Sequence, residues 1–335
     1  MRVWFNHWFS SAYHIIDMLK MANPNIKIIG TNKQINSVIK DVCDEWYEEP
    51  DINETEYITY CLNFCHEHDI DVFIPRRHLT LISRYKSLFI SNDIKVMVDD
   101  YSVIKPLNDK SITYDMFKDD IEVRVPDYFV VYDYAEFIDA WTTLRKSYTD
   151  ICMKFVKDEG AMSFRKIIDK PLDFNSLYQY QGANIEFDKL CNLLASKEKF
   201  TNGIMLMPVL SGSEISVDCL KVDNNLIAIP RRKSKSRHEY VEYTPDIMNM
   251  VNKISNKLSL KCPYNIQFRC DKNNVPYLLE INTRMSGGTY LSCLAADINI
   301  PDIAFKQLIG YKGIDVFYNK TEHIVSHVEN GILIK

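Results

Sequence analysis

The sequence predicts an α/β region with a parallel sheet, followed by a larger α+β region. Over the first hundred residues short apolar runs alternate with amphipathic segments, and beyond them longer apolar runs are joined by Asp/Asn turns. The first pattern is typical of parallel sheets and the second of antiparallel ones. The 335 residues, 46% hydrophobic and 25% charged, suit an ordinary globular protein of two to three domains.

In the N-terminal region the apolar runs predict strands and the amphipathic segments predict helices. The expected strands are Val3–Phe5, Ile26–Ile29, Asp71–Ile74 and Ile94–Val98, and the expected helices are Ser10–Met21, Asn53–His68 and His78–Ser91. The first strand-to-helix turn, from Asn6 to Ser11, contains no glycine. Dinucleotide binding needs glycine there so that backbone can approach pyrophosphate, so we expect no nicotinamide cofactor at this turn.

We expect a boundary near Pro106, after which the elements change character. The expected strands are Ile151–Lys157, Gly203–Leu210, Ile215–Val222, Leu226–Pro230, Tyr264–Cys270 and Pro276–Asn282, and the expected helices are Phe187–Lys197, Asp246–Leu258 and Thr289–Asp297. The turns at residues 223–225 and 271–274 are rich in Asp and Asn, which suits hairpins.

Charge, apolar runs and cysteines exclude several classes of function. A net charge of −5 offers no basic field for nucleic acid or an anionic membrane. Residues 1–9 lack the pattern of a signal peptide, and no apolar run reaches the ~18 residues that a bilayer span needs. Nine scattered cysteines are typical of reduced thiols, so we expect a cytoplasmic protein.

Cys61, Cys65, His66 and His68 have a spacing that zinc ligands also show. However, Asn53 followed by Glu56 resembles a capping box, and the apolar residues from Tyr57 to Cys65 repeat with helical periodicity. We therefore favour the buried face of a helix over a zinc site.

The segments Tyr264–Cys270 and Pro276–Asn282 hold the most informative polar residues. Alternate residues of a strand share a face, so Glu280 and Asn282 point the same way while Leu279 and Ile281 point into the core. A two-residue turn at Asn273-Asn274 places Gln267 directly opposite Glu280. One carboxylate with two amides suits Mg²⁺, and Arg284 just beyond suits a phosphate or carboxylate. The alternative is a solvent-facing hairpin side with Glu280 merely solvated.

Lys154 interrupts an apolar strand, Ile151-Cys152-Met153-Lys154-Phe155-Val156. A buried lysine is unfavourable unless it has a partner, which points to phosphate. The alternative is a lysine that reaches solvent from an edge strand. The following turn, from Lys157 to Ser163, contains Gly160 and could close over phosphates through its backbone N–H groups.

Together these motifs resemble the ATP-grasp superfamily, most closely the modules of carbamoyl phosphate synthase large subunits and their stand-alone relatives. The resemblance rests on Asn265-Ile266-Gln267-Phe268 and Glu280-Ile281-Asn282-Thr283-Arg284, and it extends over nearly the whole chain because Asp71–Pro75 resembles the accompanying N-terminal domain. The implied fold is a pre-ATP-grasp, Rossmann-like parallel sheet in residues 1–105, then an ATP-grasp domain in residues 106–335. Its two α+β subdomains would be residues 106–205, which contain the lid, and residues 206–335, which bind metal and substrate.

The resemblance also implies roles for individual residues. Gln267, Glu280 and Asn282 would bind Mg²⁺ or Mn²⁺ that bridges the ATP phosphates, and Arg284 would contact the transferred phosphate. ATP would be held by residues that match the family's lysines, phosphate loop, adenine-binding hinge and following strand, which are Lys110, Lys154, Ser163, Met205, Leu206, Met207 and Glu214. The loop keeps only Gly160 where relatives are richer in glycine, and the hinge lacks their ribose-binding acidic residue.

Two further segments have both a functional and a plain interpretation. Residues 231–237 form a basic loop that is either solvated or, as its place in the family order implies, a segment over the γ-phosphate in which Arg232 stabilises charge. Gly287-Gly288 precedes a helix whose N-terminus either holds an anion or simply follows a turn.

The resemblance predicts an ATP-dependent ligase that joins a small carboxylate to an amine, or to a thiol, through an acyl phosphate, with Lys154, Arg232 and Arg284 as catalytic residues. Carboxyphosphate or carbamoyl-type chemistry is one alternative, and a catalytically degenerate ATP-binding scaffold or sensor is another. A homodimer is the default expectation for the oligomeric state.

Overall fold

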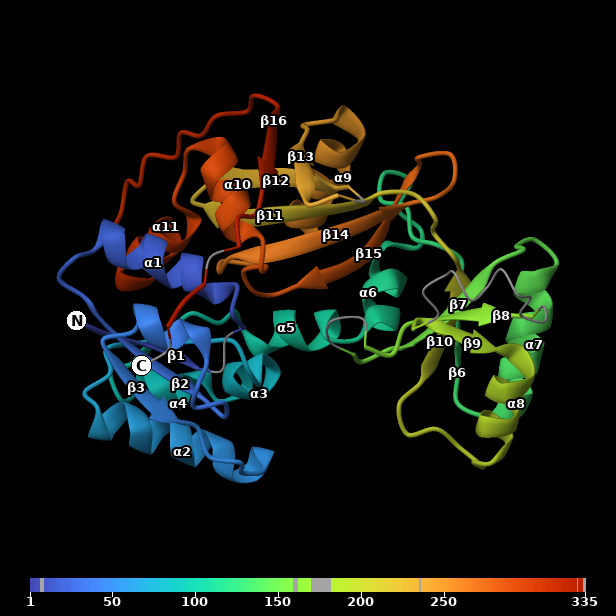
Figure 1. Ribbon diagram of the computed structural model, residues 1–335, viewed down its shortest axis with the longest axis horizontal. Coiled ribbons are helices and arrows are strands. Elements are labelled where there is room, and N and C mark those ends of the chain that lie inside the picture. Colours follow the sequence, from blue (N-terminus) through green and yellow to red (C-terminus); the bar gives the residue numbers. More distant parts are fainter. Residues whose placement is uncertain (7–8, 159–161, 170–181, 235, 330, 334–335) are drawn as a thin grey trace. The chain divides into compact units, whose positions relative to one another are not determined.

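The computed structural model describes residues 1–6, 9–158, 162–169, 182–234, 236–329 and 331–333 (Figure 1). The chain divides into two compact units that are not continuous in sequence. The first unit comprises Met1–Leu107, Glu214–Gln267 and Ile281–Lys335, and the second comprises Asn108–Ser213 and Phe268–Glu280. The domain limits expected at residues 105 and 205 stay predictions.

The first unit begins with a five-stranded sheet in the order β3-β2-β1-β4-β5, in which the neighbouring strands pair in parallel. Its strands are β1 (Arg2–Asn6), β2 (Lys27–Asn32), β3 (Glu45–Glu48), β4 (Val72–Pro75) and β5 (Lys95–Val96). The accompanying helices are α1 (Ala12–Ala22), the 3₁₀ helix η1 (Val38–Val42), α2 (Glu54–Glu67), α3 (Leu79–Arg84), α4 (Lys86–Ile90) and α5 (Tyr101–Leu107). The predicted parallel α/β region is confirmed.

Alternate side chains of β1 point to opposite faces of the sheet, and each face packs into a different hydrophobic core of this unit. Trp4 packs with α2 and the helices after β4, whereas Val3 and Phe5 belong to a second cluster that also contains Leu220 and Leu291. The second cluster joins the parallel sheet to α1, to the following sheet and to the helices α10 (Thr289–Ala296) and α11 (Ile300–Ile309). The N-terminal sheet and the C-terminal elements of this unit therefore share one core.

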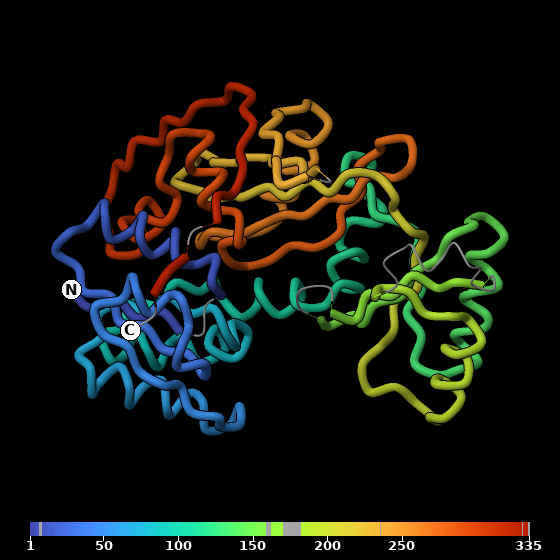
Figure 2. Tube along the Cα trace, viewed as in Figure 1, coloured from blue at the N-terminus to red at the C-terminus, as the bar shows by residue number. Residues whose placement is uncertain are grey.

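A six-stranded sheet in the order β15-β14-β11-β12-β13-β16 follows. Its strands are β11 (Glu214–Val222), β12 (Asn225–Lys233), β13 (His238–Val241), β14 (Tyr264–Cys270), β15 (Pro276–Asn282) and β16 (His323–Ser326), and α9 (Pro245–Lys257) connects β13 to β14. The division between the two units crosses β14 and β15. In Figure 2 the chain can be followed along both strands from orange toward red.

The second unit has a five-stranded sheet in the order β6-β10-β7-β8-β9. Its strands are β6 (Phe129–Val131), β7 (Ile151–Phe155), β8 (Arg165–Ile168), β9 (Asn184–Glu186) and β10 (Ile204–Pro208), with the helices α6 (Lys110–Phe117), α7 (Tyr134–Arg145) and α8 (Phe187–Ala195). The pairs β10–β6, β10–β7 and β7–β8 are antiparallel, and β8–β9 is parallel. The predicted α+β region is confirmed.

Several local predictions were wrong. The expected helix His78–Ser91 is two helices, because Tyr85 leaves helical geometry with a φ of −107°. Strand β3 was not predicted, since Glu45-Trp46-Tyr47-Glu48 is short and half charged. By contrast, α2 begins as expected, with the Asn53 side chain accepting the Glu56 N–H at 3.1 Å. Cys61 and Cys65 lie on α2 and are buried in the core, so the helical interpretation of this segment is confirmed.

The hairpin turn between β14 and β15 also differs from the prediction. The Asp271 N–H donates to Val275 at 2.9 Å and Asn274 has a φ of 62°, which is a three-residue turn and not the expected two-residue one. Farther along, Leu278 and Ile281 are buried and Leu279 is not, so placing Leu279 in the core was wrong. Buried positions three apart interrupt the period of two, as a β-bulge does.

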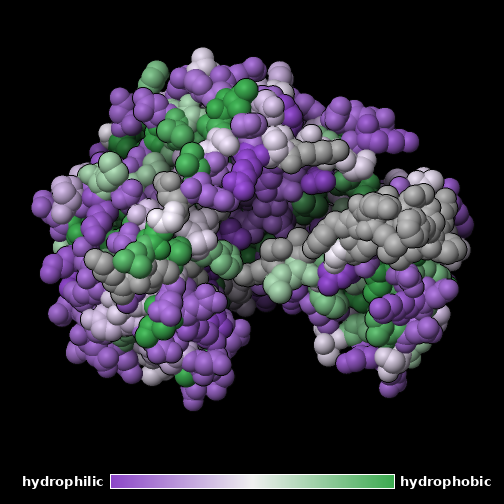
Figure 3. Space-filling model, in the orientation of Figure 1, coloured by the Kyte–Doolittle hydropathy of each residue, from purple (hydrophilic) through white to green (hydrophobic). Residues whose placement is uncertain are grey.

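No helix within the described ranges combines the length and apolarity that a membrane span requires. In the view of Figure 3, hydrophilic side chains cover most of the parallel-sheet region of the first unit.

Candidate active site

The second unit brings three of the predicted residues together: Lys110, Lys154 and Glu280. Lys154 lies on β7, which is flanked by β10 on one side and β8 on the other. Its side chain is buried, with 6% relative exposure. The alternative of a lysine that reaches solvent from an edge strand was therefore wrong.

Lys110 is the first residue of α6, where Asp109 caps the helix by accepting the Ser111 N–H at 3.0 Å. Its Nζ donates to the Asp158 carbonyl at 2.8 Å and lies 4.0 Å from Glu280 Oε2. The Glu280 side chain is 23% exposed, so it is not the fully solvated group of the alternative interpretation.

Lys110 and Lys154 are both buried, and each lies within the electrostatic influence of the other. Burial, and after it the charge of Lys110, lower the pKa of Lys154 to about 8, while the charges of Glu280 and Asp158 oppose the shift. The Glu280 and Asp158 carboxylates offset only part of the shift, so an anion at this position would remove much of the unfavourable energy of the buried Lys154 charge.

Tyr114 on α6 was not predicted and holds Lys154 in place. Its hydroxyl accepts from Lys154 Nζ at 3.2 Å and donates to the Leu279 carbonyl at 2.9 Å, and Lys154 Nζ lies 5.3 Å from its ring centroid. Tyr114 stands four positions after Lys110, one helical turn away. That spacing was the only signal in the sequence.

The expected phosphate loop lies partly outside the described residues, which exclude Glu159, Gly160 and Ala161. At its base the Asp158 carboxylate accepts the Ser163 N–H at 2.8 Å and the Ser163 hydroxyl at 2.6 Å. The Ser163 oxygen in turn accepts the Phe155 N–H at 2.8 Å. Ser163 thus closes the base of the loop.

The expected adenine-binding residues Met205, Leu206 and Met207 lie on β10 with buried side chains. Met205 pairs with Lys154 on β7 and with Val130 on β6, and the ladder with β6 ends at Leu206. Met207 pairs with Cys152 on β7, beyond the ladder with β6. Of the three residues, Met207 is the best placed to offer its backbone to a base.

In the first unit, Gln267 and Arg284 line a cleft of about 410 Å³. The cleft combines residues from α1 and the segments after β1 and β4, from β11–β14, and from the segments before α10 and after β16. They are Phe9, Ser11, Ile15, Arg76, Ser216, Arg231, Lys233, Glu239, Gln267, Arg284, Met285, Ser286, Gly287, Gly288 and His327. A cleft of this size suits a small molecule.

A buried network centred on Arg231 forms one wall of this cleft. The Arg231 guanidinium donates to Asp218 Oδ2 at 2.9 Å, to Ser292 Oγ at 2.7 Å, to Ser286 Oγ at 3.2 Å and to Glu239. Burial opposes the charge of Arg231, but Asp218 and Glu239 outweigh it and raise the arginine pKa. This guanidinium is held by the protein itself.

The expected basic loop was therefore placed wrongly, because residues Arg231–Lys233 belong to β12. The network also explains Gly288: a Cβ there would lie 2.3 Å from an Arg231 nitrogen. Gly287-Gly288 does precede α10 as expected, and here glycine allows the guanidinium to lie against the backbone.

The remaining predicted residues have other surroundings. Arg232 makes a bidentate ion pair with Glu242, with N–O distances of 2.8 and 2.6 Å, and its guanidinium stacks over the ring of Tyr240. Glu214 pairs with Lys233, and Asn282 ends β15 in the first unit. The roles of Glu214 in nucleotide binding, of Arg232 in catalysis and of Asn282 in metal binding stay predictions.

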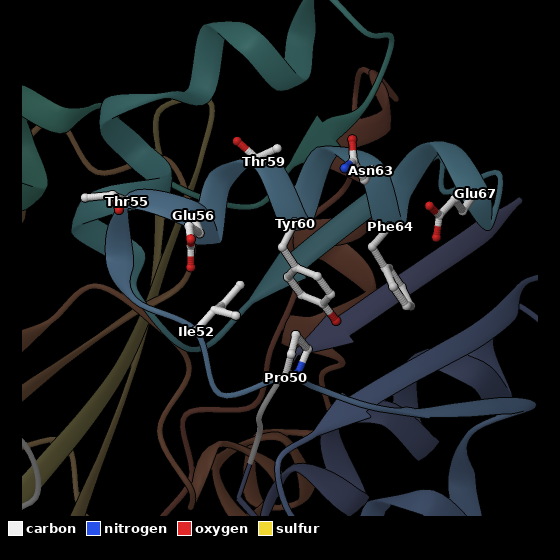
Figure 4. A pocket seen from close by; sticks show the side chains of 9 residues that line it. All are labelled: Pro50, Ile52, Thr55, Glu56, Thr59, Tyr60, Asn63, Phe64 and Glu67. Carbon is white, nitrogen blue, oxygen red and sulfur yellow. The ribbon is translucent and has the colours of Figure 1, made fainter.

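A second hollow in the first unit lies along α2 and is shown in Figure 4. Ile52, Tyr60 and Phe64 face it, together with polar residues of the helix. It contains none of the predicted site residues, so we assign it no role.

Comparison with known proteins agrees with this architecture. A model of the family described as "ATP-grasp in the biosynthetic pathway with Ter operon" matches residues 200–330. The biotin carboxylase domain of 2-oxoglutarate carboxylase from Hydrogenobacter thermophilus, solved with MgADP, ADP and bicarbonate, superposes with a TM-score of 0.70. It is 15% identical, and the alignment covers 96% of this chain and 73% of that one. Residues 200–330 thus match an ATP-grasp family model, and the chain has the fold of these solved enzymes.

Two further ATP-grasp structures are similar over most of the chain. N5-carboxyaminoimidazole synthetase from Staphylococcus aureus with ADP has a TM-score of 0.68 at 14% identity, covering 96% of this chain and 81% of that one. L-amino acid ligase from Bacillus licheniformis has a TM-score of 0.67 at 13% identity, covering 92% and 74%. No curated protein sequence matched the chain.

Proposed function

We propose that this ATP-grasp protein is an ATP-dependent ligase that joins a carboxylate to an amine through an acyl phosphate. The observation that carries the proposal is the buried group of Lys110, Lys154 and Glu280 in the second unit. The pKa of Lys154 stays depressed although the Glu280 and Asp158 carboxylates oppose the shift, and the phosphates of ATP would add the negative charge that favours its ammonium form.

The protein's own residues would act mainly by holding and neutralising charge. Tyr114 fixes Lys154, and the Asp158 carbonyl fixes Lys110, so both ammonium groups are oriented before a ligand arrives. Such preorganised charge stabilises the phosphoryl group during transfer. Arg284, which lines the cleft of the first unit, is proposed to contact the transferred phosphate.

The chemistry then proceeds in two steps. A carboxylate oxygen of the substrate attacks the γ-phosphorus of ATP while the bond to the β-phosphate oxygen breaks, giving an acyl phosphate and ADP. The amine next attacks the acyl carbon, inorganic phosphate leaves with the electron pair of the C–O bond, and the amine loses a proton. A thiol in place of the amine would give a thioester by the same steps.

The residues present fit Mg²⁺ or Mn²⁺. The described residues contain no group of three or more His, Cys, Asp or Glu side chains placed to hold a metal. In the second unit, the Glu280 carboxylate together with substrate phosphates would hold the cation, and oxygen ligands of this kind are those that Mg²⁺ accepts. When bound, it would supply Lewis-acid stabilisation of the phosphate oxygens.

The test is ADP and phosphate release from Mg·ATP in the presence of amino acids, dipeptides and small carboxylic acids, each with and without an amine. We expect release to require one acid together with one amine, and Glu280→Ala to abolish it while leaving the circular dichroism spectrum unchanged. Lys118, on the same helix as Lys110 but exposed, provides the matched control: Lys118→Ala should retain full release. Full activity of Glu280→Ala would refute the assignment.

The same assay separates the alternatives. Release that depends on bicarbonate alone would establish carboxyphosphate chemistry, and tight ATP binding with no release under any condition would identify a scaffold or sensor. A cytoplasmic location and small-molecule substrates stay predictions.

A further inference from the structure

A row of polar side chains crosses three neighbouring strands of the six-stranded sheet, β12, β13 and β16 (Figure 1). Arg231 on β12 lies across from Val241 on β13, and Glu239 on β13 lies across from Val325 on β16. Glu239 stands two positions before Val241, and His327 stands two positions after Val325. Alternate residues of a strand share a face, so Arg231, Glu239 and His327 are diagonal neighbours on one face of the sheet. All three line the cleft.

Glu239 contacts the two ends of this row through different oxygens. Its Oε2 pairs with the Arg231 guanidinium, which also pairs with Asp218 at 2.9 Å. Its Oε1 lies 4.0 Å from Nε2 of His327. This distance is longer than a hydrogen bond, but it is short enough for the carboxylate to stabilise a positive charge on the imidazole. Arg231 thus fixes the Glu239 carboxylate in a position beside the histidine ring.

The other ring nitrogen of His327 is held by Tyr290, the second residue of α10. The Tyr290 hydroxyl and His327 Nδ1 form a hydrogen bond, and the two rings meet edge to face with their centroids 5.6 Å apart. The Tyr290 ring also stacks on His14 of α1, with 4.2 Å between the centroids. The orientation of the His327 ring is therefore fixed by a helix that is itself packed against α1.

This arrangement has the parts of a general base. A histidine acts as a base when one ring nitrogen keeps its proton in a fixed hydrogen bond and the other nitrogen accepts a proton from the reacting group. A hydrogen on Nδ1 of His327 would be donated to the Tyr290 oxygen, so Nε2 would be the accepting nitrogen. The Glu239 carboxylate beside Nε2 would stabilise the imidazolium that forms.

We propose that His327 is the general base that accepts the proton lost by the amine when it attacks the acyl phosphate, and that Tyr290 and Glu239 position and stabilise it. The inference rests on the proposed function and adds to it the residue that activates the nucleophile. The amine nitrogen forms a bond to the acyl carbon, and inorganic phosphate leaves with the electron pair of the C–O bond. The N–H proton passes to Nε2 of His327 and from there to solvent.

The experiment compares two nucleophiles with the full chain, Mg·ATP and the acid that supports ADP release. One is the amine substrate, and the other is hydroxylamine, a weakly basic nucleophile that captures acyl phosphates without help from a base. We expect His327→Gln to form the amide about 100-fold or more slowly than the wild type, and to form the hydroxamate at an undiminished rate. A purely structural role of His327 would slow both products alike, and that result would overturn the proposal.

Further variants separate the base from the groups that position it. His323, at the start of β16, is exposed and contacts Thr321 at 3.0 Å, so His323→Gln is the matched control and should change neither rate. Tyr290→Phe and Glu239→Gln each remove one support of the ring, so each should slow amide formation by up to about tenfold without changing hydroxamate formation. An unchanged amide rate in both variants would overturn the positioning roles of Tyr290 and Glu239.

The outcomes also separate this inference from the proposed function. If the wild type forms neither ADP nor hydroxamate with any carboxylic acid, the ligase itself is refuted, and the inference falls with it. If the wild type forms an amide and His327→Gln forms it equally fast, the ligase is upheld and His327 is refuted as its base.

Discussion

Each unit of this protein buries a cation, and the two cations are treated in opposite ways. Arg231 in the first unit faces two carboxylates and two serine hydroxyls, and its pKa is raised although burial opposes its charge. Lys154 in the second unit is comparably buried, but its pKa falls to about 8 through burial and the charge of Lys110. The protein itself neutralises the charge of Arg231, whereas we propose that a bound ligand neutralises the charge of Lys154.

This difference distinguishes structural from functional buried charge. A satisfied ion network fixes neighbouring elements in one arrangement and is damaged when one member is removed. A poorly neutralised buried charge lowers the stability of the free protein, and it is retained where a bound ligand neutralises it. The two types can be told apart by stability measurements alone.

The largest expected effect is the loss of stability on removing Arg231. Arg231→Met leaves Asp218 buried without its cation, so we expect the free energy of unfolding to fall by about 3–5 kcal/mol in urea titrations. Arg232→Met is the matched control on the same strand; its partly exposed pair with Glu242 should contribute at most about 1 kcal/mol. Equal effects for the two variants would mean that the buried network has no special role.

Removing Lys154 should act in the opposite direction. Methionine has a volume similar to that of lysine, and Lys154→Met eliminates a buried charge on a group whose pKa is depressed. We therefore expect the free energy of unfolding near pH 7 to rise by about 1–3 kcal/mol. The same urea titration measures it. A clear loss of stability would show that Lys154 is as well satisfied as Arg231, and would break the comparison.

The pH dependence sharpens the contrast further. The folded-state pKa of Lys154, about 8, lies below the unfolded value of 10.5, so its destabilising effect is complete below pH 8 and is relieved as the pH rises from 8 toward 10.5. A bound anion favours the protonated form of Lys154, so nucleotide binding above pH 8 should be accompanied by uptake of a proton. The affinity for nucleotide should therefore fall by up to about tenfold per pH unit. Calorimetry at pH 8.5 in two buffers of different ionisation enthalpy measures this uptake, and it should vanish in Lys154→Arg.

Much of the fold could be predicted from local sequence. The limits of β14 and β15 and the cap at Asn53 follow from residue pattern alone, because each depends on neighbours within a few positions. The turn between β14 and β15 was mispredicted because the Asp271 carboxylate accepts the N–H groups of Asn273 and Val275, at 2.8 and 2.9 Å, and stabilises a longer turn.

The candidate site was predictable only where a single residue is conspicuous. Lys154 stands out because it breaks an apolar strand. Arg231 does not, since its partner Ser292 is 61 positions away, and the segment consequently resembled a solvated loop.

The most direct test of the central claim is calorimetric titration of Mg·ATP into the wild-type protein, Lys154→Met and the control Lys118→Met. We predict that the wild type and Lys118→Met bind alike, and that Lys154→Met, although folded and no less stable, binds about 100-fold more weakly or not at all. Undiminished binding by Lys154→Met would show that the buried lysine does not serve the nucleotide, and would contradict the account.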